Sequence, residues 1–181
     1  FIVDPAGSEG FLDMQTALDT VPPGSTLLVK GVFNSGFPFV VTKSVTILEL
    51  NVETIKYDTT SFTNHFVLDI QAGPDDVVVV KDSRILGKIS YGPASEAIHV
   101  TSVGDLVVRD SELTGGSGSI SAACETYDNN GDAIVVESAR AVSIIGCIVQ
   151  GGGPGDALVR DDTCPSAWTA RGGHGVLVTG T

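Results

Sequence analysis

The 181-residue sequence has few positive charges: 10 lysines and arginines stand against 22 aspartates and glutamates, for a formal net charge of -12. Negative charge of this size repels phosphate groups, which argues against nucleic acid or an anionic membrane surface as a partner. It leaves an anionic polysaccharide open as a ligand, because calcium can bridge two sets of carboxylates. No apolar run approaches the roughly 18 residues of a membrane-spanning helix, so we expect no membrane insertion.

Cysteine is scarce as well, with three in the chain, so at least one stays unpaired. Cys124 and Cys164 fall in two successive long loops and could form a disulfide in an oxidising compartment; three free thiols are the alternative. Cys147 is expected to be a small buried residue. Residues 1–3 lead at once into a turn and show no signal peptide, so we expect the mature or excised part of a secreted or cell-surface protein. An intact cytosolic protein is the alternative.

The sequence contains instead a repeated pattern of short, β-branched segments. Leu68, Ile98, Ile134 and Val176 hold equivalent positions, at intervals of 30, 36 and 42 residues. Within each complete repeat, a second segment begins eight residues after the first. A constant pair of segments with a variable excursion is typical of stacked coils whose loops lengthen on one side.

Each segment is about four to six residues long and rich in Val and Ile, which favours strands over helices. Short strands, turns of Gly, Asp, Ser and Asn, and no helices between them predict an all-β fold, namely a right-handed parallel β-helix. Alternate side chains of each strand then point inward. They would form one stack of Ile98, Val100, Ile134, Val136, Val176 and Val178, a second of Leu106, Val108, Val142 and Ile144, and a small-residue column of Ser83, Ser111 and Cys147.

Residues 1–24 predict a strand followed by a helix that caps the β-helix. A helix from about residue 11 to about residue 20 would place Phe11, Met14, Ala17 and Leu18 on one face, before a Pro-Pro-Gly stop. Such a helix covers the strand edges and apolar stack at an open end. Residues 25–181 would form the coils, so we expect one domain over residues 1–181, which can be a fragment of a longer solenoid.

Several short motifs in the first 50 residues follow a fixed order. They are Val3-Asp4-Pro5 with Gly7, the helix with Ala17, residues 23–29 (Pro-Gly-Ser-Thr-Leu-Leu-Val), Gly31-Val32-Phe33 and residues 43–47 (Lys-Ser-Val-Thr-Ile). This order resembles the opening of the pectin-lyase-like superfamily, whose N-terminal coil has a strand, a cap helix, a Pro-Gly turn and a Lys-Ser-x-Thr-Ile strand. The resemblance implies a right-handed parallel β-helix, and the superfamily contains both carbohydrate-active enzymes and non-catalytic proteins.

The residues directly before the first strand of successive repeats are Glu96, Asp132 and His174. Equivalent positions on adjacent strands lie about 4.8 Å apart, so these side chains should be neighbours. Two such carboxylates raise each other's proton affinity or share a cation, and with the histidine a general acid and base pair is available. His99 faces outward on its strand, and it matters only if Asp69 or an arginine lies against it.

Three further motifs resemble the polygalacturonase-type glycoside hydrolases: Asn130-Gly131-Asp132, Gly155-Asp156-Ala157 and residues 171–175 (Arg-Gly-Gly-His-Gly). In that family, acids on successive turns deliver a proton to the leaving oxygen and activate water. The resemblance implies catalytic roles for Asp132, Asp156 and His174. Arg171, which begins the third motif, is a further catalytic candidate. Ala157 stands where the family has a second Asp, so only one carboxylate of the pair that an inverting hydrolase needs is assigned.

The two longest loops should emerge side by side and hold most of the nearby aromatic and charged residues. An aromatic ring stacks on the C–H face of a sugar while carboxylates take its hydroxyls. This predicts a polysaccharide-binding wall of Tyr127, Arg160, Asp161, Asp162 and Trp168. Oxygen ligands at nearby and alternate positions, Glu125, Asp128, Asn130 and Asp132, offer a calcium site.

Together these features predict a secreted, polysaccharide-active β-helix protein: a glycoside hydrolase or a calcium-assisted polysaccharide lyase acting on an acidic glycan. A lyase also needs a base for the proton next to the uronate carboxyl, and Arg109, Arg160 and Arg171 are the candidates. The alternative is a non-catalytic β-helix that serves as a structural, adhesive or carbohydrate-binding region of a surface protein. Calcium is the one cofactor that the sequence suggests.

Overall fold

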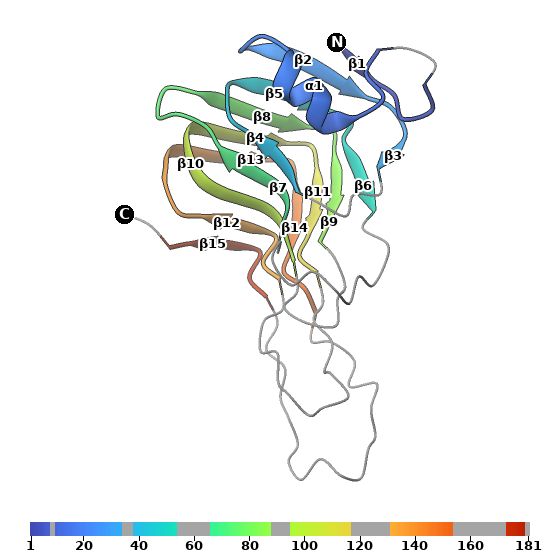
Figure 1. Ribbon diagram of the computed structural model, residues 1–181. Helices are drawn as coiled ribbons and strands as arrows, with labels where there is room; N and C mark the ends of the chain where they lie inside the picture. Colours follow the sequence, from blue (N-terminus) through green and yellow to red (C-terminus); the bar gives the residue numbers. More distant parts are fainter. Residues whose placement is uncertain are drawn as a thin grey trace, which may run out of the picture.

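The computed structural model describes residues 1–7, 10–33, 38–53, 66–87, 95–116, 131–153 and 173–179. Within them the chain is mostly β-structure, as the all-β prediction required (Figure 1). One helix, α1 (Met14–Thr20), accompanies the strands. The strands are β1 (Ile2–Val3), β2 (Ser25–Val29), β3 (Val32–Phe33), β4 (Phe39–Val41), β5 (Val45–Leu48), β6 (Asn51–Glu53), β7 (Phe66–Gln71), β8 (Val77–Lys81), β9 (Arg84–Leu86), β10 (Glu96–Arg109), β11 (Glu112–Thr114), β12 (Ile134–Val136), β13 (Ala139–Ile145), β14 (Ile148–Gln150) and β15 (Val176–Val178).

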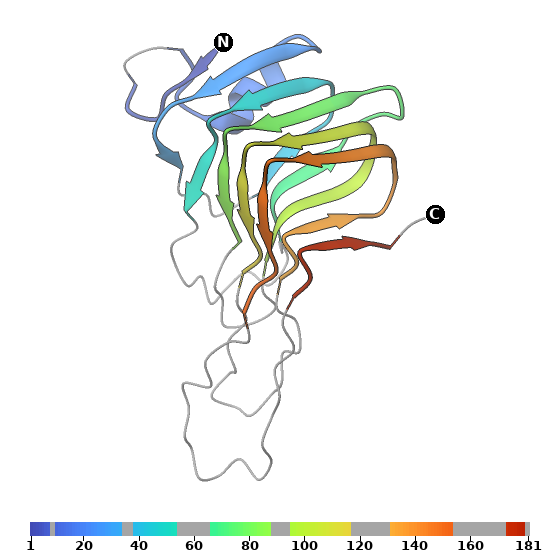
Figure 2. The ribbon, with the colours of Figure 1, turned by 180° about the vertical axis from the view of Figure 1, so that it is seen from behind.

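The pairings among the described strands are all parallel and form a 10-stranded sheet and a 5-stranded sheet. Three rows of strands can be followed from the N-terminal end, and they finish at β13, β14 and β15 (Figures 1 and 2). Row 1 holds β1, β2, β5, β8, the second half of β10, and β13. Row 2 holds β3, β6, β9, β11 and β14, and row 3 holds β4, β7, the first half of β10, β12 and β15.

The register keeps the repeat that the sequence predicted. In row 3, Leu68 is the partner of Ile98, Ile98 of Ile134, and Ile134 of Val176. Neighbouring strands therefore belong to successive repeats, and equivalent positions of the repeats lie side by side.

Strand β10 is 14 residues long because it continues from row 3 into row 1 without a break. Its first half pairs with β7 and β12, and its second half with β8 and β13. Gly104 lies between the two halves. A Cβ atom there would be 2.5 Å from the carbonyl oxygen of Pro74 and 2.6 Å from that of Asp76. Both distances are well inside van der Waals contact, so this position requires glycine.

The predicted inward stacks make up the centre of the core. Fully or almost fully buried members are Ile98, Val100, Leu106, Val108, Ile134 and Val136. The prediction was wrong for the last repeat, where Val142, Val176 and Val178 are 37%, 41% and 63% exposed. The reason is topological: among the described strands, β13 and β15 are paired on one side only.

The predicted small-residue column is confirmed at Ser83 and Ser111, which are both buried. The backbone N–H of Leu50 donates to Oγ of Ser83, and that of Ser83 to Oγ of Ser111, both at 3.1 Å. Each hydroxyl also donates to the carbonyl two residues before it. Cys147 continues the column as a free thiol, but it is only partly buried and not buried as expected. The serines thus join successive repeats at a turn where regular strand pairing is interrupted.

Helix α1 is shorter than the sequence predicted, since it begins at Met14 and not near residue 11. Asp13 is its N-cap, and the Asp13 carboxylate accepts a 2.7 Å bond from the backbone N–H of Thr16. Phe11 forms an isolated parallel bridge with Val3 instead. The capping carboxylate therefore fixes where the helix starts.

The helix covers the free edge of β4, as expected of a cap. Met14, Ala17 and Leu18 are buried in the core. The side-chain amide of Gln15 accepts a 2.7 Å bond from the backbone N–H of Val40 and donates a 3.1 Å bond to its carbonyl. These two bonds replace those of a neighbouring strand, so the backbone of Val40 is satisfied at an edge that would otherwise be open.

We predict that Ile98→Ala lowers the free energy of unfolding by about 2–5 kcal/mol, because the side chain is fully buried. Ile145→Ala is the matched control, since Ile145 is 49% exposed on β13, and its effect should stay within about 0.5 kcal/mol. Chemical denaturation followed by far-UV circular dichroism measures both. Equal losses in the two variants would contradict the inward placement of Ile98.

Candidate functional site

Row 3 carries a column of ionisable residues where its strands begin. Ile98, Ile134 and Val176 are register partners, so the residues two positions earlier, Glu96, Asp132 and His174, are equivalent too. The predicted column is therefore formed. Nδ1 of His174 lies 3.0 Å from Oδ1 of Asp132, and the backbone N–H of His174 donates to the same oxygen. Two contacts from one residue thus hold the carboxylate of Asp132 in place.

Glu96 is partly buried and binds a proton more tightly than an ordinary glutamate. Its pKa is raised from 4.5 to about 7, first because burial disfavours the charged carboxylate. His99 lowers this pKa, whereas the negative charges of Asp132, Glu137 and Asp69 raise it. Oε2 of Glu96 is buried and has no hydrogen-bond partner among the described residues. Glu96 can therefore serve as a proton donor near neutral pH.

His99 lies between two carboxylates of the neighbouring strands. Its Nδ1 is 3.4 Å from Oδ1 of Asp69, and its Nε2 is 3.2 Å from Oε1 of Glu137. We expected His99 to matter only if Asp69 or an arginine lay against it, and Asp69 does. The outer face of row 3 is also more enclosed than predicted, since Asp69 and Val135 are both buried.

The sequence did not identify Glu137 as a member of this site. The register pairs His99 with Val135, and Glu137 reaches the ring diagonally from two positions further along the chain. Diagonal neighbours on one face are within reach of long side chains. Val135 and Glu137 are two residues apart and so point to the same face as His99. This spacing was the feature of the sequence that could have indicated the contact.

Most of the other predicted site residues lie outside the described residues, and their roles stay predictions. They are Asp156 and Arg171 for catalysis, Tyr127, Arg160, Asp161, Asp162 and Trp168 for sugar binding, Glu125, Asp128 and Asn130 for calcium, and Cys124 and Cys164 for the disulfide. In the part of the chain that the structure describes, no group of three or more His, Cys, Asp or Glu side chains is placed to hold a metal.

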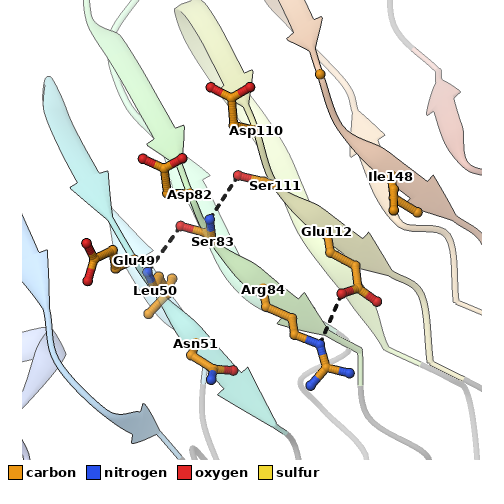
Figure 3. A pocket seen from close by; sticks show the side chains of 11 residues that line it. Glu49, Leu50, Asn51, Asp82, Ser83, Arg84, Asp110, Ser111, Glu112 and Ile148 are labelled. Atoms are coloured by element: carbon orange, nitrogen blue, oxygen red, sulfur yellow. Dashed lines mark hydrogen bonds and ion pairs between the residues drawn. The ribbon is translucent and has the colours of Figure 1, made fainter.

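A second polar region lies at the turn between rows 1 and 2 (Figure 3). Glu49, Asp82 and Asp110 take left-handed backbone conformations there, with φ of 58°, 51° and 50°. They line an open depression of about 590 Å³, in which Nε of Arg84 lies 3.2 Å from Oε2 of Glu112. This region has no histidine among its lining residues, whereas row 3 brings His99 and His174 against carboxylates. Row 3 is therefore the stronger candidate.

Comparisons with known proteins add no further assignment: no protein-family model, curated protein or solved structure matches this chain. The site is therefore argued from its own residues. Among the described residues there is no helix with the length and apolar character needed to cross a membrane.

We predict that the stability of the protein depends on the proton of Glu96. The pKa of Glu96 is about 7 in the folded protein against 4.5 for the free side chain, so the folded state binds this proton more tightly. The resulting stabilisation is complete below the lower pKa and is lost as pH rises through the higher one. The free energy of unfolding should therefore fall between about pH 5 and about pH 8 in the unmodified protein, relative to Glu96→Gln.

Urea denaturation of both proteins at several pH values measures this difference. Asp76 provides an internal check, because hydrogen bonds from Ser44 lower its pKa from 3.8, and any stability that it contributes is lost only at more acidic pH. A pH-independent difference between the two proteins across the neutral range would show that Glu96 does not titrate there.

Proposed function

We propose that this chain is a right-handed parallel β-helix of the pectin-lyase-like kind, secreted or exposed at the cell surface, that hydrolyses a polysaccharide at the Glu96–Asp132 site. The observation that carries the proposal is Glu96, a carboxyl group whose pKa is raised to about 7 and which shares a column with the carboxylate of Asp132. The parallel rows, with one strand from each repeat, support the β-helix, as do the N-terminal motifs.

The chemistry that this pair can perform is the cleavage of a glycosidic bond. A neutral carboxyl group gives its proton to the leaving oxygen as the glycosidic bond breaks, and a negative carboxylate stabilises the positive charge on the sugar ring or attacks the anomeric carbon. Water then adds its oxygen to that carbon, and the proton that it loses restores the first carboxyl group. Glu96 fits the first role because burial and its acidic neighbours hold its proton. Asp132 fits the second role because the backbone N–H of His174 donates to its carboxylate and fixes its orientation.

A hydrolase is favoured over a lyase because Glu96 and Asp132 offer two carboxyl groups in one column. A hydrolase uses one carboxyl group to donate a proton and a second one as a carboxylate, whereas a lyase begins with a single base that removes a proton. An acidic glycan remains the proposed substrate, with Arg160 and Arg171 as the cations that would bind its carboxylates. Calcium would serve the same purpose by bridging carboxylates of the protein and the glycan.

We predict that Glu96→Gln and Asp132→Asn each lower kcat by about 10²–10⁴-fold on a glycan that the unmodified protein cleaves. Each substitution removes the proton or the charge while it preserves the size of the side chain. The assay incubates the protein with polyuronates and with neutral plant and algal glycans, with and without calcium, and follows new reducing ends. Glu112→Gln is the matched control, because this carboxylate pairs with Arg84 far from row 3 and its loss should leave kcat unchanged.

Unchanged turnover in both Glu96→Gln and Asp132→Asn would remove this site. Products that absorb as unsaturated uronates, and that disappear with a chelator, would identify a calcium-assisted lyase instead. No cleavage of any glycan would leave the non-catalytic, structural or carbohydrate-binding role as the better account of the protein.

A further inference from the structure

The ring of His99 belongs to a chain of polar contacts that crosses three neighbouring strands of row 3. Nε2 of Gln71 donates a 2.5 Å bond to Oδ2 of Asp69, so both oxygens of this buried carboxylate are engaged, the other by His99. On the far side of the ring, Glu137 is 51% exposed. The chain of contacts therefore runs from a buried carboxylate, through the imidazole, to a carboxylate at the surface.

The ring is also fixed by packing. Phe66 stacks on His99 with ring centroids 4.6 Å apart and an interplanar angle of 16°. Only 14% of the histidine side chain is exposed. A solvated histidine on a strand would have neither a stacked ring nor carboxylates at both nitrogens, so simple exposure to solvent does not account for this environment.

The hydrogen-bonding capacity of imidazole limits what this arrangement can be. A neutral ring has one N–H and can donate to one carboxylate, whereas the doubly protonated ring donates through both nitrogens. Since Asp69 and Glu137 both face the ring, the two contacts together need one proton more than the single N–H of the neutral ring supplies. Around Glu96, the electrostatic effect of His99 opposes those of Asp69, Asp132 and Glu137.

We propose that His99 is a positioning residue of the Glu96–Asp132 site, which ties Glu137 to Asp69 and balances the negative charge around Glu96. The role of His99 in catalysis rests on the proposed function, whereas its effect on the charge around Glu96 does not. No role in the reaction is assigned to the ring itself; it acts through the carboxylates that it holds.

The proposal predicts opposite effects from two neighbouring substitutions. His99 lowers the pKa of Glu96, so His99→Gln should move this pKa above about 7. Glu137 raises the same pKa, so Glu137→Gln should move it below about 7. A ring that only filled space would not produce shifts of opposite sign, because loss of packing acts on the exposure of Glu96 and not on the sign of the charge beside it.

The experiment is an NMR titration of side-chain carboxyl carbons in protein labelled with ¹³C-glutamate. Glu96→Gln assigns the resonance of Glu96, and Glu112→Gln is the control that removes a distant carboxylate and should leave the titration unchanged. An upward shift with His99→Gln and a downward shift with Glu137→Gln would support the proposal. Shifts in the same direction, or no shift in either variant, would overturn it.

Two further readouts keep the test decisive. If circular dichroism shows that His99→Gln does not fold, Glu137→Gln alone decides, because this exposed side chain can be changed without disturbing the core. The absence of a downward shift in Glu137→Gln would then refute the proposal.

On a glycan that the protein cleaves, the alkaline limb of the pH profile of kcat should move in the same two directions, with KM little changed. If no glycan is cleaved, the titration still tests His99, so failure of the proposed function and failure of this inference are separate results.

Discussion

Parallel backbone pairing between successive repeats is the constraint on which the rest of the structure depends. The register that pairs Ile98 with Ile134 and Val176 decides which side chains enter the core. A slip of one residue would turn every inward side chain of a strand to the opposite face. The same register brings Glu96, Asp132 and His174 together, although they are far apart in the sequence. The core and the candidate site therefore have one common origin.

Within that frame, location decides what each carboxyl group can do. Glu96 and Glu112 lie on strands of the same repeat, but Glu96 is partly buried among acids while Glu112 pairs with Arg84. Burial raises the pKa of Glu96 to about 7, and the negative charges of the acids around it act in the same direction. The proton donor proposed here is thus produced by neighbours from several repeats, and no single motif of the sequence contains it.

The parts of the structure that follow from local periodicity could be predicted from the sequence. The inward positions of Ile98 and Ile134 and the buried column at Ser83 and Ser111 follow from alternation and repeat length. Features set by side-chain reach or by topology could not be predicted in this way. The start of α1 depends on the carboxylate of Asp13, which caps the helix. The exposure of Val178 depends on which strands have a partner on both sides. The contact of Glu137 with His99 depends on side chains that reach each other diagonally.

The order of the rows also bears on how the chain folds. Each pairing in row 3 from Leu68 to Val176 joins residues that are 30 to 42 positions apart, so no repeat completes its sheet contacts alone and each pairing closes a long loop. Gln15 closes the edge of β4, whereas each repeat, once in place, offers its strand edges to the repeats on either side. Pairing that has begun in one repeat can therefore spread to its neighbours, because a formed strand edge is a ready partner for the next strand.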